Sequence, residues 1–241
     1  MNTEPHVITV SGVRVQVVRK AIKNLHLGVY PPEGRVRVAA PMAVSDDAVR
    51  LAVVGKLVWI KRQRTRFRTQ LRQSEREMVS GESHYFLGQR YRLRVVRKDG
   101  PTKVLIRSRI LELHVSQKAI AREREQVLQR WYRQQLRDLI PPLLIKWQAA
   151  LDVKVAECCV KKMKTKWGSC NAEAQRIWVN LELAKKPVQC LEYLIVHELA
   201  HLIERHHNDN FVAIMDEHLP QWRLNRQELN SAPLANETWS Y

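Results

Sequence analysis

A short segment near the C-terminus carries the residues best suited to chemistry. His197, Glu198 and His201 form the pattern H-E-x-x-H within residues 191–207, LEYLIVHELAHLIERHH. Residues four positions apart lie on one face of a helix, so the two imidazoles can reach one metal ion. Glu198 lies about 100° round the helix from His197, too far to be a ligand but close enough to act as general base towards a water held by the metal. The spacing therefore predicts half of a hydrolytic zinc site.

The surrounding residues predict a buried helix for this segment. Pro187 suits a first helical turn, and apolar residues recur at helical spacing afterwards. They are Leu191, Leu194, Ile195, Leu199 and Leu202. The alternative is a pair of core histidines satisfied by hydrogen bonds, but further His and acidic residues follow at once, which favours a metal site.

A catalytic zinc ion needs a third protein ligand. The downstream candidates are His206, His207, Asp209, Asp216, Glu217 and His218. His207 lies six residues after His201, a spacing that works if the helix ends near residue 205 and the chain turns back across the ion. The polar residues 208–210 are then suited to start another helix. We favour His207, with His206 as the nearest rival and Glu217 as the alternative if the next helix supplies the ligand.

The rest of the chain predicts an α+β protein with two lobes. Residues 7–38 alternate between apolar and polar and predict a small antiparallel sheet. Ser45 predicts the start of a helix that continues to residue 76, and residues 81–115 predict more strands. We therefore expect a β-rich N-terminal domain with a basic helix at residues 1–115 and a second domain at residues 116–241.

The second domain should place a small antiparallel sheet beside the H-E-x-x-H helix. Ser116 predicts the N-cap of a long helix through residue 139, which the prolines at 141 and 142 should kink or restart. Residues 154–166 and 176–183 predict two strands, joined by a loop that contains W-G-S-C at residues 167–170. An edge strand next to the helix can pair with an extended substrate backbone.

The composition points to an anionic partner. Lys and Arg number 41 against 24 Asp and Glu, a net charge of +17, which suits nucleic acid or an acidic protein. Arg64, Arg68, Arg72 and Arg76 recur every fourth residue on one helix face. Like charges at this spacing repel by a few tenths of a kcal/mol per pair, so a bound anion would relieve the row. The alternative is a solvated helix face.

The cysteines and the N-terminus predict a cytoplasmic protein without disulfides. The four cysteines form no C-x-x-C pair, and the first residues lack both a basic start and a long apolar run. No apolar window approaches a membrane span. Cys170 is interpreted as a packing residue rather than as a ligand or nucleophile, because it has no partner cysteine at metal-binding spacing.

Several motifs occur in the order found in one protein family. These are K-W-G-S-C at 166–170, I-W-V-N at 177–180, Pro187, Y-L-I-V at 193–196 leading into H-E-L-A-H-L, and finally His207 with Phe211. The N-terminal half adds G-R-V-R-V at 34–38, Ala40-Pro41, Trp59-Ile60, and Leu87-Gly88 with Tyr91. In these motifs the chain resembles the YgjP-like zinc metallopeptidases, relatives of SprT-type and WLM-type proteins.

The resemblance implies a zincin-like catalytic domain behind a β-rich N-terminal domain. It implies Zn²⁺ bound by His197, His201 and His207, with Glu198 as general base. The predicted function is hydrolysis of peptide bonds in a protein or peptide substrate through a metal-bound water activated by Glu198. The alternative is a nucleic-acid-binding protein, or a protease acting on DNA-bound proteins, in which the zinc is largely structural.

Overall fold

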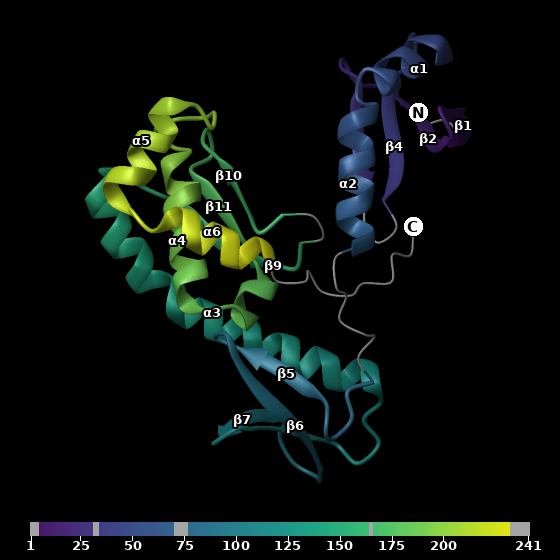
Figure 1. Ribbon diagram of the computed structural model, residues 1–241. Coiled ribbons are helices and arrows are strands. Elements are labelled where there is room, and N and C mark those ends of the chain that lie inside the picture. The colour runs from purple at the N-terminus through teal and green to yellow at the C-terminus, as the bar shows by residue number, and fades with distance from the viewer. Residues whose placement is uncertain (1–4, 31–33, 70–76, 164–165, 232–241) are drawn as a thin grey trace. The chain divides into compact units, whose positions relative to one another are not determined.

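The computed structural model of the chain describes residues 5–30, 34–69, 77–163 and 166–231 (Figure 1). Contacts between residues divide the chain into two compact units, Met1–Leu71 and Arg72–Tyr241. Both units combine helices with a β-sheet, which confirms the α+β class.

The first unit is a four-stranded sheet followed by two helices. The strands are β1 (His6–Val10), β2 (Val13–Lys20), β3 (His26–Tyr30) and β4 (Arg35–Pro41), in the order β1-β2-β4-β3. The central pair β2 and β4 is parallel, so the prediction of an antiparallel sheet is wrong at its centre. Each of these two strands ends a hairpin, and the two hairpins join side by side in the same direction.

The two helices of this unit cover an apolar core. Ser45 caps α1 (Asp46–Val54), and its hydroxyl accepts a hydrogen bond from the Ala48 amide at 3.2 Å, as predicted. The predicted single helix is interrupted at Gly55, after which α2 (Leu57–Thr69) begins. The fully or almost fully buried core consists of Val15, Val17, Val36, Val38, Val49, Val53 and Ile60, among others.

The second unit begins with a sheet of the same topology. Its strands β5 (Ser83–Phe86), β6 (Gln89–Arg97), β7 (Lys103–Arg107) and β8 (Ile110–Val115) lie in the order β5-β6-β8-β7, again with a parallel central pair. The first hairpin of each sheet turns through two residues with positive φ. These are Ser11-Gly12 in the first sheet and Leu87-Gly88 in the second.

One long helix, α3 (Ala121–Leu151), joins this sheet to the rest of the unit. It begins after Ile120 rather than at Ser116, and it continues through both prolines at 141 and 142 instead of restarting. Buried side chains along its whole length explain why it stays continuous, since tertiary packing outweighs local propensity. Because α3 packs on β7 and β8 as well as on the elements after it, the predicted boundary at residue 115 falls inside one continuous core.

The remaining elements form a second, smaller sheet and three helices. The sheet contains β9 (Glu157–Lys161), β10 (Gly168–Asn171) and β11 (Arg176–Asn180) in the order β10-β11-β9. It is mixed rather than antiparallel, because β9 and β11 are parallel. W-G-S-C does not lie in a loop, since its last three residues belong to the edge strand β10. A 3₁₀ turn, η1 (Leu181–Lys185), leads to α4 (Val188–Ala200), α5 (Asp209–His218) and α6 (Trp222–Ser231), which contact one another through α4 (Figure 1).

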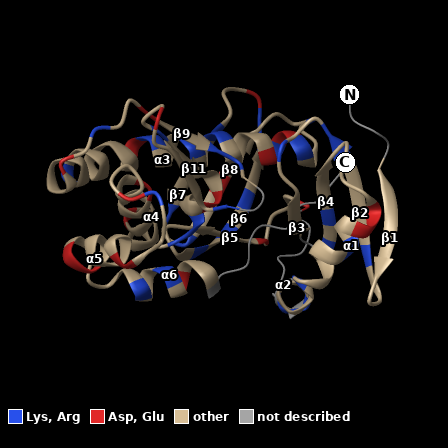
Figure 2. Cartoon of the chain, turned by 90° about the horizontal axis from the view of Figure 1, so that it is seen from above, with Lys and Arg blue, Asp and Glu red and all other residues tan. Residues whose placement is uncertain are grey.

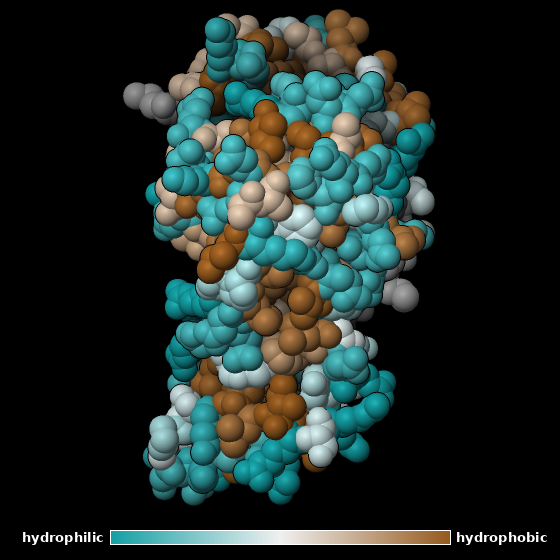
Figure 3. Space-filling view, turned by 90° about the vertical axis from the view of Figure 1, so that its left-hand side faces the viewer, coloured by the Kyte–Doolittle hydropathy of each residue, from teal (hydrophilic) through white to brown (hydrophobic). Residues whose placement is uncertain are grey.

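The surface mixes apolar and polar residues. On the face shown in Figure 3, hydrophobic residues lie in groups between hydrophilic ones. Within the described ranges, no helix has both the length and the apolar character needed to cross a membrane. All four cysteines are free.

Candidate metal centre

The helix α4 that carries H-E-x-x-H is fixed at its start by the preceding sheet. Pro187 is its N-cap residue, and the Gly88 backbone lies so close that a Cβ there would be 2.7 Å from the proline ring. The Leu87 amide donates to the Ala184 carbonyl at 2.9 Å, just before the helix. Leu191, Ile195 and other apolar side chains of α4 are buried, as the helical periodicity predicted.

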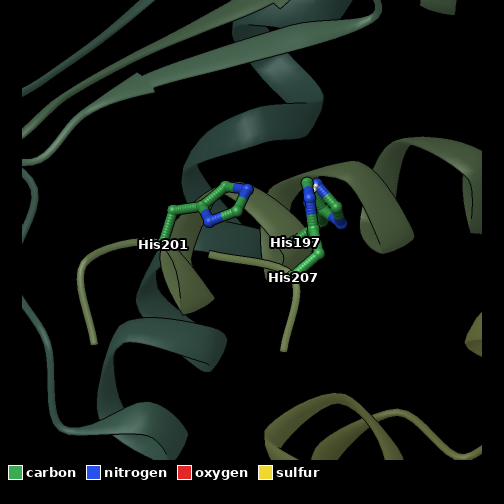
Figure 4. Close-up of side chains that lie close together, drawn as sticks. All are labelled: His197, His201 and His207. Carbon is green, nitrogen blue, oxygen red and sulfur yellow. Dashed lines mark hydrogen bonds between the residues drawn. The ribbon is translucent and has the colours of Figure 1, made fainter. Parts of the chain in front are cut away.

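Three histidines gather at the other end of α4 (Figure 4). The ligand-type nitrogens of His197, His201 and His207 all lie within 4.8 Å of one another. The Nε2 atoms of His197 and His207 are 3.1 Å apart. Two nitrogens bound to one tetrahedral zinc ion at 2.0–2.1 Å would be about 3.3 Å apart, so this pair fits a shared ion closely.

The end of α4 orients His201. The helix ends at Ala200, earlier than the predicted residue 205, and tighter turns follow in which the Leu202 and Ile203 amides bond three residues back. His201 Nδ1 lies 3.1 Å from the Glu204 carbonyl oxygen. A hydrogen bond from Nδ1 to this carbonyl leaves Nε2 free to bind a metal ion, the arrangement that metal-binding histidines usually adopt.

The turn that presents His207 is held by polar side chains. The Glu204 carboxylate accepts a hydrogen bond from the His206 amide at 3.0 Å. Asn208 caps α5, its side-chain oxygen accepting from the Phe211 amide at 3.0 Å, which confirms the predicted start of that helix. Nothing in the sequence pattern predicted that Glu204 organises this turn.

Phe211 packs against all three imidazoles. Its ring centroid lies 5.0 Å from that of His197, 4.8 Å from His201 and 4.7 Å from His207, and the ring is 2% exposed. In the sequence Phe211 follows His207 among the family motifs, and no pattern predicted its contacts with the three imidazoles. Its contacts hold three rings from two chain segments in one place.

Burial favours the neutral form of two of the histidines, His197 and His207. Burial, followed by the charges of His201, His207 and Arg226, lowers the pKa of His197 to about 3. Burial also lowers the pKa of His207. A neutral imidazole is the form that binds a metal ion.

Glu198 lies beside the histidines, and the pKa of its carboxyl is raised. It is 5% exposed, and burial raises the pKa of its carboxyl to about 7 although the charge of Lys166 lowers it. Gly168 of β10 makes room for it, because a Cβ at that position would lie 2.5 Å from Glu198 Oε1. The glycine of the W-G-S-C motif is therefore explained by the close approach of the β10 backbone to the Glu198 carboxyl.

A cavity opens at these residues. One hollow of about 730 Å³ is lined by β10 together with His197, Glu198, His201 and His207. A second hollow of about 550 Å³ shares three of these residues and is bounded by α6 and the start of α5. The carboxylate and the imidazoles are therefore accessible to a substrate.

The other predicted candidates lie elsewhere. His206 and Glu217 are exposed, and neither belongs to the histidine cluster found among the described residues. Asp216 accepts hydrogen bonds from Trp222 and Arg223. Burial and the charge of Glu198 raise the pKa of the Cys170 thiol to about 11, so it stays protonated, which agrees with a packing role.

The predicted arginine row is described only in part. Arg64 lies on α2, half-buried, against Gly34. The side chain of Arg68, and Arg72 and Arg76 altogether, lie outside the described residues.

Comparison with known proteins agrees with this geometry. No curated protein matches the sequence. The family model described as YgjP-like, metallopeptidase domain, matches residues 23–232, which include β3 and β4 of the first sheet, all of the β5–β8 sheet and the three histidines. A match to a metallopeptidase domain implies that the protein is a peptidase that uses a metal ion. Since the match covers most of its length, the chain belongs to the YgjP-like metallopeptidase family, as its motifs predicted.

Proposed function

We propose that this protein is a zinc-dependent peptidase, with His197, His201 and His207 as the metal ligands and Glu198 as the general base. The observation that carries the proposal is the 3.1 Å separation of the His197 and His207 Nε2 atoms, with the third imidazole within 4.8 Å. Imidazole nitrogens suit zinc, and three protein ligands are typical of its catalytic sites. When bound, the ion would acidify water and polarise the peptide carbonyl.

Glu198 is suited to move the proton. A base works best when its pKa lies near the working pH, because it must both accept a proton and return it to the leaving amine. Burial brings the pKa of this carboxyl to about 7 in the metal-free protein. Gly168 and the apolar wall of α4 limit where the carboxylate can lie.

The strand β10 is suited to orient the substrate. It is the edge of its sheet, and Gly168, Ser169, Cys170 and Asn171 line the cavity. An extended peptide added to this edge would be held by backbone hydrogen bonds, which supply affinity without demanding a particular side chain.

Metal analysis and one substitution test the proposal. Purified protein should contain zinc, and Glu198→Gln should keep the metal while losing about 10²–10⁴-fold of peptide-cleaving activity, the usual contribution of a general base. Glu173→Gln is the matched control, since Glu173 is an exposed carboxylate lining the same cavity. A protein without bound zinc, or a Glu198→Gln variant as active as the wild type, contradicts the proposal.

A specific observation also favours nucleic acid as an accessory partner. On the face of the β5–β8 sheet away from its core, Arg92, Arg94, Lys103 and Arg107 are exposed around a single carboxylate, Glu112. Glu112 lies 3.5 Å from Arg94 and 3.7 Å from Arg107, so it neutralises only part of this charge. Cations spaced along neighbouring strands suit a phosphate backbone.

Salt dependence tests this second proposal. Binding to duplex DNA should weaken as salt rises, with a slope of about −0.9 per phosphate contact. Arg92→Gln combined with Lys103→Gln should reduce the slope by about two. Absence of binding at low salt, or an unchanged slope in this variant, would exclude the sheet face as a nucleic-acid surface.

A further inference from the structure

The two sides of the cavity differ in character. On the β10 side the lining includes the polar residues Asn171 and Glu173. On the α6 side the walls are aromatic and apolar, formed by Trp167, Tyr193, Phe211, Val212, Trp222 and Leu229. Both sides include His197 and Glu198, so a peptide that crosses the site would place different residues in different surroundings.

Arg226 is the cation that α6 contributes to the aromatic side. It projects from α6, whose other basic residue is Arg223 (Figure 2), and it is exposed. Its guanidinium carbon lies 5.9 Å from the centre of the Trp222 ring. Within the part of the chain that the structure describes, Arg226 makes no hydrogen bond and no ion pair.

Arg223, on the same helix, differs from Arg226 because its charge is neutralised by a carboxylate. Its guanidinium also lies over Trp222, at 4.6 Å. Unlike Arg226, it binds Asp216 through both terminal nitrogens, with Nη2 at 3.0 Å from Oδ2. Only Arg226, of these two, lines the cavity and keeps its donors available.

Most of the other exposed charges in the cavity are also positive. Lys166 and Arg205 are exposed lining residues, and Glu173 is the only exposed carboxylate among the described residues that line it. Clefts lined by one sign of charge raise the local concentration of ligands of the opposite sign. A negative group is therefore favoured on the substrate, and a basic side chain is disfavoured near α6.

We propose that Arg226 binds a carboxylate of the substrate, so that the enzyme selects peptides with a carboxylate-bearing residue on the α6 side of the site. This rests on the proposed peptidase function. The aromatic wall suits the aliphatic stem of such a residue, and the guanidinium can bind a carboxylate through two parallel hydrogen bonds. The carboxylate can come from an Asp or Glu side chain or from the C-terminus of the peptide.

Peptide libraries test the proposal and separate the two sources. Ten-residue peptides with Glu, Gln or Lys at each position, with free or amidated C-termini, are offered to the zinc-loaded wild type and to Arg226→Gln, Arg226→Lys and Arg223→Gln. Cleavage is read by mass spectrometry. Binding is read by fluorescence anisotropy in the Glu198→Gln background, so it does not depend on turnover.

A charged hydrogen bond contributes about 10- to 100-fold, so wild type should prefer Glu over Gln at one position, or the free over the amidated C-terminus, by that factor. Arg226→Gln should lose the preference, Arg226→Lys should keep part of it, and Arg223→Gln should keep all of it. Equal use of Glu and Gln together with equal use of both termini overturns the proposal, as does a preference that survives in Arg226→Gln.

The outcomes distinguish this proposal from the peptidase proposal. Acidic peptides bound through Arg226 but never cleaved would leave the carboxylate site standing and contradict the enzyme. Peptides cleaved without an acidic preference would do the reverse. Absence of both binding and cleavage contradicts both proposals.

Discussion

His197 lies on α4 and His201 is its C-cap residue, whereas His207 lies beyond the helix, on the turn ordered by Glu204. We predict that His207→Ala lowers zinc affinity at least about 10-fold, since no other described side chain of ligand type is close enough to replace it. The measurement is zinc competition against a chelating dye.

His206→Ala is the matched control for this substitution. His206 is exposed and contributes its backbone amide, not its imidazole, to the turn. The zinc affinity of the His206→Ala variant should stay within about threefold of the wild type. If the two variants lose affinity equally, a group from the following helix, such as Glu217, must be the third ligand.

The buried carboxyl of Glu198 should make the stability of the metal-free protein depend on pH. Its pKa is raised from 4.5 to about 7 in the folded state, so folding favours the protonated form. The stability that this preference contributes to the folded state is fully present below pH 4.5 and is lost as pH rises through 7. Glu198→Gln lacks it, and we predict that the variant gains stability relative to wild type over this window, by up to about 3 kcal/mol.

Urea unfolding of both proteins at pH 5 and pH 8, with a chelator present, measures this difference. Other groups titrate alike in the two proteins and cancel in the comparison. A difference in unfolding free energy that is the same at both pH values would show that the carboxyl is not buried.

Among the elements, the β5–β6 turn is expected to fix the start of the H-E-x-x-H helix. Gly88 has φ +79°, and a Cβ there would meet Pro187 at 2.7 Å. Gly12 occupies the corresponding turn of the first sheet with φ +76°, but a Cβ there would meet nothing within 4 Å. We predict that Gly12→Ala costs about 1 kcal/mol for its backbone conformation, and that Gly88→Ala costs about 1–3 kcal/mol more.

Chemical unfolding of both variants measures these costs, and zinc affinity should fall only in Gly88→Ala. Equal costs and unchanged zinc affinity would show that the contact with Pro187 does not position the helix.

Local patterns predicted most elements but not how they pair. Alternating valines predicted the strands of the first sheet, and apolar spacing with Pro187 predicted α4. The parallel centre of each sheet was missed, because alternation shows which face of a strand is buried and not which strand lies beside it. The continuous α3 was missed because local rules give weight to two prolines and none to the core that holds both halves of the helix.

The site shows the same limit. H-E-x-x-H predicted that His197, Glu198 and His201 lie together, because all three fall within five consecutive residues of the chain. Phe211, Gly168 and Arg226 come from other elements. Their proximity depends on the fold of residues 166–230 as a whole, and no spacing within one segment encodes it.

At the scale of the whole molecule, the two separate hydrophobic cores predict two unfolding transitions. The proposed zinc site lies in the second unit, Arg72–Tyr241. A chelator should therefore lower the midpoint of the unfolding transition of that unit alone. At 100 times the dissociation constant, a ligand contributes about 2.7 kcal/mol, which corresponds to several degrees for a unit of this size. Differential scanning calorimetry with and without chelator measures it, and a single transition that shifts as one would contradict independent units.

The hydrogen bond from the Leu87 amide to the Ala184 carbonyl affects the order in which the two units can fold during synthesis. It joins residues about a hundred positions apart, and such non-local contacts form late in folding. The first unit lies wholly within the first 71 residues, so it can fold while the rest is still being made. The turn that supports α4, by contrast, must wait for α4 itself, and every residue of the cavity lies between positions 166 and 230. A nascent chain therefore completes its cavity only after residue 230 has left the ribosome, so the first unit can be folded before the site is able to cut any peptide.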